Sequence, residues 1–291
     1  MKLDLARDKL KTGNSNEIIS ALHIMEKKGT LSDLPTIMPL TKHDKAIIQK
    51  TASNTVCNII REKLVTNFND LEPELRKKLG TLISNLNPSI VTEISKDIYS
   101  EDNERRLRSV QTLGLLKKNP QIRTILAKLV TDRDEKIRAT AVNLLGKIVG
   151  PHDQEIILSL LNDKDKRVRA NTVESLESLG NKRMIPILQR FRKDPNNRIR
   201  GNVLKTLFTL DNIDIKQDLL EMFETNDNFM MATALWVITQ TKLHSPAIED
   251  VCGHCMLSDN EMVLDNARKA LTALNSPRSK GYLTYLSELH K

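Results

Sequence analysis

The sequence predicts an all-α protein, a right-handed α-α superhelical solenoid of about eight or nine stacked antiparallel helix pairs. Segments 132–148, 163–179 and 194–210 superimpose at a spacing of 31 residues without a gap. Each segment carries apolar or small residues at the spacing of one helix face, and no run of the chain shows the period of a strand. A repeat of this length is typical of stacked helical units that bury a continuous core between neighbours.

The helical pattern also recurs outside these three segments. In each copy, apolar or small residues follow an anchor residue at 4, 8 and 11 positions, which places them on one helix face. The anchors lie 27–33 residues apart and are Ile48, Leu75, Arg105, Ile137, Val168, Ile199, Met230 and Val263. A further helix pair is expected before residue 40. Breaker residues such as Gly150-Pro151 and Ser245-Pro246 separate the predicted helices.

The whole chain, 1–291, is predicted to form one solenoid domain. Residues 1–99 form divergent N-terminal repeats, 100–210 the clearest repeats, and 211–291 divergent repeats with a cap, since terminal repeats are usually atypical. Charge follows the same division. Residues 101–210 carry 23 Lys and Arg against 13 Asp and Glu, whereas 211–291 carry 7 against 12. The basic middle bears on which partners the protein attracts, not on its fold.

Composition narrows the class of protein further. With 39% hydrophobic and 28% charged residues, the chain can bury a core and stay in solution. No stretch approaches the roughly 18–20 consecutive apolar residues of a membrane helix, so no membrane insertion is expected. The amino-terminal segment lacks the apolar core of a signal peptide, and three cysteines cannot build a disulfide framework. We therefore expect a cytoplasmic protein.

The repeat resembles the HEAT repeat family, in particular bacterial HEAT-like repeats of about 31 residues. The resemblance rests on acidic turn residues and on arginines at the start of the second helix: Asp132, Asp163 and Asp194, with Arg76, Arg106, Arg138, Arg169 and Arg200. It implies that these side chains bond to one another and to neighbouring repeats. The expected structural ladder consists of Asp132, Asp163, Asp194, Arg138, Arg169 and Arg200.

A second basic row lies one position before the ladder arginines. It consists of Lys136, Arg167 and Arg198. Cations near a helix N-terminus do not stabilise the helix, so helix stability does not explain them. Because stacked helices lie about 8–10 Å apart, the row would form a regular positive edge. It is either an anion-binding ridge or a solvated edge.

Polar residues three and six positions after the anchors are expected to line the concave surface. The candidates for partner binding in these rows are Arg108, Asn143, Asn171, Asn202, Lys205 and Trp236. Their amides and hydroxyl neighbours either hydrogen-bond along the stack or bind the backbone of a peptide. Near the C-terminus, Phe229 and Met230 are expected in the core, whereas Trp236 is expected to be exposed and is the better interface candidate.

The sequence offers little evidence of a catalytic or metal-binding site. No Gly-rich phosphate loop, nucleophile elbow or His-Glu-x-x-His motif is present. Cys252 and Cys255 form a Cys-x-x-Cys pattern around His254, with His244 upstream. A zinc site needs four converging ligands, and this segment is typical of a solenoid helix with both cysteines in the core. We expect no enzyme activity, no cofactor and no metal.

The sequence therefore favours a non-catalytic scaffold that binds a protein partner through its concave surface or its basic edge, an edge that would suit an acidic partner. An alternative is nucleic-acid binding through 101–210, a segment that contains neither Trp nor Tyr and so lacks stacking platforms. A HEAT-like lyase is a third reading, implied by the resemblance alone. The partner's identity and the oligomeric state are not predicted.

Overall fold

The computed structural model describes residues 2–148 and 154–289, and its regular elements there are helices. The expected turn at Gly150-Pro151 lies outside the described residues. Contacts between Cα atoms divide the chain into two compact units, Met1–Leu144 (unit 1) and Leu145–Lys291 (unit 2). The predicted all-α repeat fold is confirmed, and the single solenoid over 1–291 stays a prediction.

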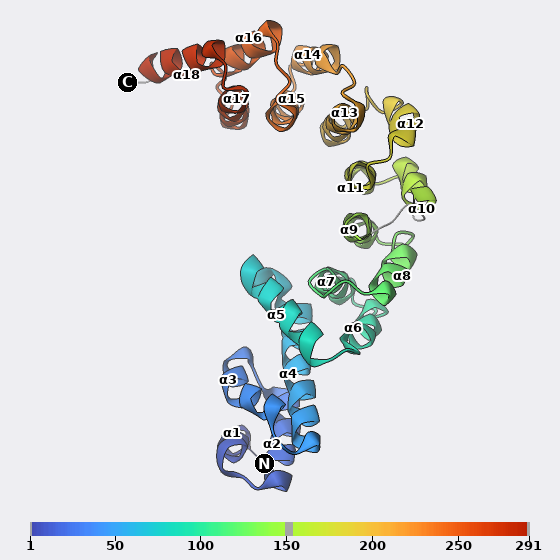
Figure 1. The fold of residues 1–291 in the computed structure, drawn as a ribbon, viewed down its shortest axis with the longest axis vertical. Helices are drawn as coiled ribbons and strands as arrows, with labels where there is room; N and C mark the ends of the chain where they lie inside the picture. The colour runs from blue at the N-terminus through green and yellow to red at the C-terminus, as the bar shows by residue number, and fades with distance from the viewer. Residues whose placement is uncertain (1, 149–153, 290–291) are drawn as a thin grey trace. The chain divides into compact units, whose positions relative to one another are not determined.

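Unit 1 contains α1 to α8 and most of α9 (Figure 1). Its α-helices are α1 (Leu3–Thr12), α2 (Ser15–Lys28), α3 (Leu34–Ile37), α4 (Ala46–Asn67), α5 (Pro73–Leu86), α6 (Ile90–Ile98), α7 (Asn103–Leu113), α8 (Pro120–Leu129) and α9 (Glu135–Gly146). Short 3-10 helices cover Leu31–Asp33, Met38–Lys42 and Phe68–Asp70. The 22-residue α4 contacts α2, α5 and α7, so these N-terminal repeats depart from the regular pairing.

One predicted anchor in unit 1 is wrong. Leu75 is 40% exposed, although the spacing rule placed it in the core. It lies in the first turn of α5, and the helix is buried only further on, at Leu79, Gly80 and Ile83. The pattern found the buried face of α5 but extended it one turn too far.

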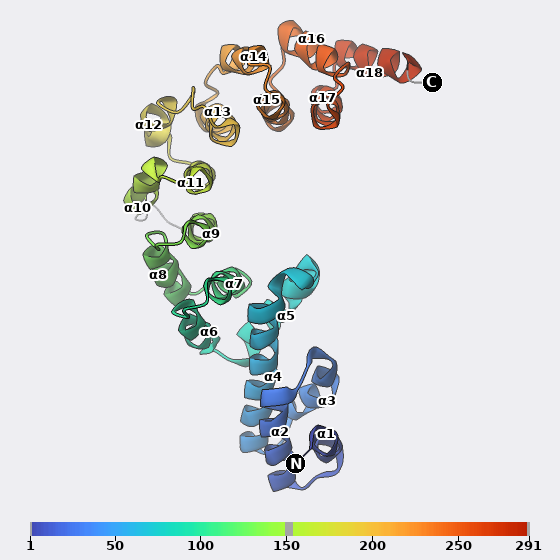
Figure 2. The same cartoon turned by 180° about the vertical axis from the view of Figure 1, so that it is seen from behind.

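Unit 2 consists of two layers of helices. The inner layer is α11 (Lys166–Leu179), α13 (Asn197–Asp211), α15 (Asn228–Thr241) and α17 (Glu261–Leu274). The outer layer is α10 (Gln154–Ser159), α12 (Ile185–Gln189), α14 (Lys216–Glu224) and α16 (Pro246–Cys255), followed by α18 (Pro277–Leu289). Short 3-10 helices cover Leu160–Asn162 and Lys182–Met184. Figure 2 shows the two layers from behind, and inner helices contact their inner neighbours in sequence order.

Each inner helix begins at the same kind of residue. The side chains of Asp165, Asn196, Asp227 and Asn260 accept hydrogen bonds from backbone N–H groups of the first turn. These bonds satisfy donors that have no partner within the helix. Each inner helix also ends at a residue in the left-handed conformation, namely Gly180, Asn212, Lys242 or Asn275. The sequence period is therefore a period of caps as well as of apolar anchors.

The anchors form the core between the layers. Val168, Ile199 and Val263 are fully buried, and Met230 is 6% exposed. The inner helices also pack closely at Gly201, where an added methyl group would overlap the side chain of Thr233 on α15. This close approach brings α13 and α15 together beneath the surface that carries the candidate site.

Candidate partner-binding groove

The predicted ladder residues hold the turns and link neighbouring helices. In unit 1, buried Arg106 donates from Nη2 to both carboxylate oxygens of Asp132 at 2.7 Å. Arg138 and Arg169 instead donate to backbone carbonyls of their own turns, at Asp132 (2.9 Å) and Asp163 (2.8 Å).

The remaining ladder residues also form hydrogen bonds within their turns or to the next repeat. Arg200 reaches the next repeat, where it donates to the Asp218 carbonyl (3.1 Å) and to Glu221 (3.3 Å) on α14. The carboxylates of Asp132, Asp163 and Asp194 each accept from the backbone N–H two residues later. The ladder side chains therefore form hydrogen bonds within the protein.

The basic row differs from the free edge that the sequence predicted. Lys136 on α9 is exposed. Arg167 forms an ion pair with Asp165 at 3.0 Å, and hydrogen bonding to this guanidinium holds the pKa of Asp165 below its usual value. Arg198 donates to the Asn171 amide oxygen (2.9 Å) and to Glu174 (3.1 Å), while half of its side chain stays exposed. Arg167 is therefore partly neutralised by its own repeat, and Arg198 by the preceding one.

The expectation of a uniformly exposed polar row is wrong for Asn171 and Asn202. They are 9% and 4% exposed. Asn202 donates to the Ala170 carbonyl (3.3 Å) and to Glu174 (2.9 Å), and Asn171 accepts from Arg198. Small residues let the inner helices approach closely, so this row falls within the helix interface. Of the two roles weighed for it, hydrogen bonding along the stack is the one seen here.

The other candidates of these rows lie in different surroundings. In unit 1, half-buried Arg108 donates to the Thr66 carbonyl at the end of α4, and Asn143 is half-buried on α9. In unit 2, Lys205 on α13 forms an ion pair with Glu177 at 2.9 Å. Its Nζ also lies 5.5 Å from the centroid of the Trp236 ring, within reach of a cation–π contact. Lys205 on α13 thus contacts the face of the Trp236 ring on α15.

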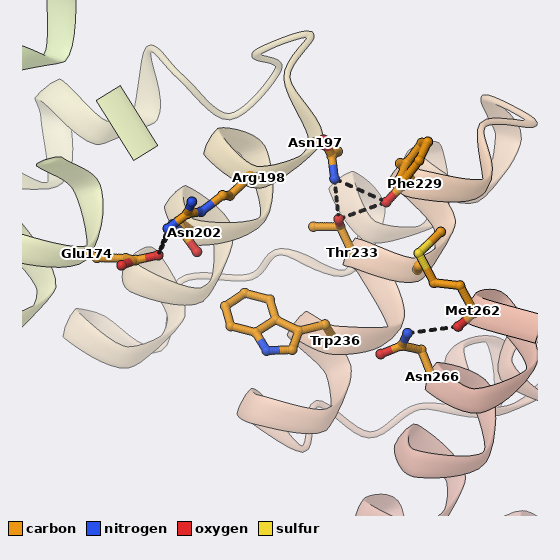
Figure 3. A pocket seen from close by; sticks show the side chains of 10 residues that line it. Glu174, Asn197, Arg198, Asn202, Phe229, Thr233, Trp236, Met262 and Asn266 are labelled. Carbon is orange, nitrogen blue, oxygen red and sulfur yellow. Dashed lines mark hydrogen bonds and ion pairs between the residues drawn. The ribbon is translucent and has the colours of Figure 1, made fainter. Parts of the chain in front are cut away.

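A groove of about 370 Å³ crosses the inner layer of unit 2 from α11 to α17 (Figure 3). Its lining side chains include Glu174, Arg198, Phe229, Trp236, Met262 and Asn266. Asn197 closes one wall by donating to the Thr233 hydroxyl (2.8 Å) and to the Phe229 carbonyl (3.3 Å). The groove brings together Arg198, Asn202 and Trp236 from the predicted partner-binding set.

Phe229 is the residue that sequence reasoning missed. It is 65% exposed, whereas the sequence placed it in the core with Met230. Only one of two adjacent helical residues can occupy the anchor position, and Met230 fills it. Phe229 therefore falls in the row of Arg167 and Arg198, one position before the anchor. The repeat register contained this signal, whereas the apolar character of phenylalanine favours the core.

The Cys-x-x-Cys pattern is placed in the core of unit 2. Cys252 and Cys255 on α16 are buried, and burial raises the pKa of both thiols, that of Cys255 to about 11. His244 Nε2 lies 2.7 Å from a carboxylate oxygen of Glu249. Within residues 2–148 and 154–289, no three His, Cys, Asp or Glu side chains are grouped to hold a metal ion. Among the helices of that same part, none is long and apolar enough to cross a bilayer.

The groove lies within a segment that matches a known family. The family model of HEAT repeats matches residues 154–239. Residues 154–239 are HEAT repeats. The resemblance based on turn aspartates and helix arginines is thereby confirmed, and the matched segment contains Arg198, Phe229 and Trp236. No curated protein matches the chain in sequence.

Solved structures of helical repeat proteins are similar to the chain. A mutant of Kap121p has a TM-score of 0.50 at 12% identity, covering 99% of this chain and 38% of that chain. The complex of CpcE and CpcF of phycocyanin lyase from Nostoc sp. PCC7120 has a TM-score of 0.48 at 14% identity, covering 88% and 94%. A computationally designed armadillo repeat protein for modular peptide recognition has a TM-score of 0.40 at 15% identity, covering 72% and 100%. At these identities, the likeness to Kap121p shows the fold alone.

Proposed function

We propose that the protein is a non-catalytic scaffold that binds a protein partner, and that a segment of this partner lies in the groove of unit 2. The observation that carries the proposal is the pair Phe229 and Trp236 on the groove face of α15. Phe229 is 65% exposed and Trp236 is half-buried. Exposed apolar groups that line a groove are typical of binding sites, and aromatic side chains supply much of the binding energy at protein interfaces.

The surroundings of these two aromatic residues support a binding role. Helix α15 contains no charged residue between Asn228 and Thr241. The ion pair of Lys205 with Glu177 holds a cation against Trp236, so the ring is positioned before any partner arrives. A preformed site loses less conformational freedom on binding than a mobile one.

The basic edge receives less support as the main contact. Arg167 and Arg198 already bond to side chains of their own or neighbouring repeats. The same internal pairing weakens the case for nucleic-acid binding through 101–210, although exposed Lys164 and Lys166 remain at the start of α11. Binding that rests on such lysines would fall steeply with added salt, whereas a groove contact centred on aromatic groups would change little.

The sole tryptophan of the chain lies in the groove, so its fluorescence reports on occupancy. Linear random peptides displayed on phage are selected on the intact protein, and the enriched peptides are titrated against wild type. We expect binding to change the Trp236 emission, and Phe229→Ala to weaken it about tenfold or more. Tyr99→Ala removes an aromatic side chain that is 78% exposed in unit 1 and serves as the control. Enriched peptides that bind Phe229→Ala as tightly as wild type would contradict the groove proposal.

A further inference from the structure

We propose that the partner segment carries an acidic side chain three residues from a bulky apolar one and binds in an extended polyproline II conformation. The carboxylate contacts Arg198, and the apolar side chain lies against Phe229 and Met262. This inference rests on the proposed function, because it names the kind of segment that the same groove accepts.

The first observation is a change of chemistry along one row of the groove. The position before the anchor is occupied by Arg167 on α11, Arg198 on α13, Phe229 on α15 and Met262 on α17. The row therefore changes from cationic to apolar between α13 and α15. Figure 3 shows Arg198, Phe229 and Met262 among the side chains that line the groove. A ligand that crosses these helices meets a cation first and apolar side chains next.

The second observation concerns the guanidinium group of Arg198. Its hydrogen bonds to the Asn171 amide oxygen and to Glu174 both come from Nη2. A guanidinium has five N–H donors. Within residues 2–148 and 154–289, Arg198 donates only from Nη2, so its Nη1 and Nε donors remain for a ligand. The side chain is 51% exposed, which keeps these donors accessible. Glu174 accepts hydrogen bonds from both Arg198 and Asn202, and so holds the guanidinium in place. A carboxylate of the ligand is the complementary partner for the remaining donors of Arg198.

The third step is the spacing expected between the two parts of the row. Stacked helices lie about 8–10 Å apart, which sets the separation between the Arg198 and Phe229 positions. A polyproline II segment has three residues per turn and rises about 3.1 Å per residue, so residues three apart lie on one side and about 9 Å from each other. A β-strand would place residues three apart on opposite sides. The stacking distance thus favours a polyproline II segment with an acid and an apolar residue at i and i+3.

Short synthetic peptides test this directly. None of them contains tryptophan, so the fluorescence signal comes from Trp236 alone. The acidic probe contains Asp-Pro-Pro-Phe, a second probe contains the reverse order Phe-Pro-Pro-Asp, and matched probes replace Asp by Lys or Ser. Titration against the full chain is followed by Trp236 fluorescence. We expect the better of the two acidic probes to bind about fivefold more tightly than its Ser analogue, with the Lys analogue weakest.

Variants of Arg198 give the decisive comparison. Arg198→Glu should reverse the order, so that the Lys probe binds best, and Arg198→Gln should remove the preference between charged probes. Exposed Arg183 lies on the 3-10 helix Lys182–Met184, and Arg183→Glu should leave the order unchanged. A reversed preference cannot arise from misfolding. Equal binding of the Asp, Ser and Lys probes with retained dependence on Phe229 would overturn this inference and leave the scaffold proposal standing. Failure of every probe, while library-selected peptides still require Phe229, would overturn this inference in the same way.

Discussion

Helices α13 and α15 are the same element of two consecutive repeats, yet they present different chemistry to the groove. Both begin at a capping side chain, both bury their anchor, and both end in a left-handed residue. Helix α13 carries Arg198 before its anchor, and α15 carries Phe229. The comparison shows that the repeat fixes the core and the caps, while the position before the anchor varies in its chemistry.

The largest expected effect is a difference in stability between variants of the α13 anchor and of the exposed aromatic residue of α15. Ile199 is fully buried, so Ile199→Ala should lower the free energy of unfolding by about 3 kcal/mol through lost burial and a residual cavity. Phe229→Ala should change it by less than about 0.5 kcal/mol, because that side chain is mostly exposed. Urea unfolding followed by circular dichroism measures both. A similar loss for the two variants would show that Phe229 packs in the core.

A second prediction concerns the contact between the two helices. Gly201→Ala places a methyl group against Thr233 and should cost about 1–3 kcal/mol. Thr233→Ser removes the methyl of Thr233 while keeping the hydroxyl that Asn197 donates to. The double variant should therefore recover much of the lost stability. If the two changes are simply additive in urea unfolding, α13 and α15 are not in close contact at this position.

The helix ends allow a finer comparison. Helix α13 ends at Asn212 and α15 ends at Lys242, both with positive φ. Asn tolerates the left-handed region, whereas Lys is strained there. Lys242→Gly should therefore raise the free energy of unfolding by about 1 kcal/mol, and Asn212→Gly by clearly less. Thermal unfolding of the two variants side by side decides this. An equal gain at both ends would mean that Lys242 is not strained.

The smallest effect is a pH dependence at the start of α11. Hydrogen bonding to Arg167 lowers the pKa of Asp165 in the folded protein below its ordinary value of 3.8. A lowered folded pKa stabilises the protein above the unfolded value, and this contribution is lost as the pH falls through the folded pKa. Asp165→Asn keeps a capping oxygen but cannot ionise. Wild type should thus be slightly more stable than this variant near neutral pH, and the difference should shrink below about pH 4. A difference that is constant from neutral to acid pH would contradict the assignment.

The sequence allowed the helix faces and the anchors to be anticipated where the repeat is regular, whereas the capping residues became apparent only in the structure. Leu75 was misplaced because the pattern cannot show where along α5 the neighbouring helix begins to cover it. Asn171 and Asn202 were expected on the surface because the pattern of one repeat does not show how closely α11 and α13 pack; in the structure both side chains bond between these two helices. Phe229 differs from the prediction because its position before the anchor, and not its hydrophobicity, decides its exposure. The groove itself, which combines side chains of four helices, could not be derived from one repeat.

The central claim is that the groove of unit 2 binds a partner segment through the apolar side chains of α15. The most direct measurement is the affinity of one library-selected peptide for wild type and for Phe229→Ala, followed by Trp236 fluorescence, with Tyr99→Ala as the control. We predict a loss of about tenfold or more for Phe229→Ala and no loss for Tyr99→Ala, with helicity unchanged in both. Equal affinity for wild type and Phe229→Ala would contradict the claim and place the binding surface elsewhere on the protein.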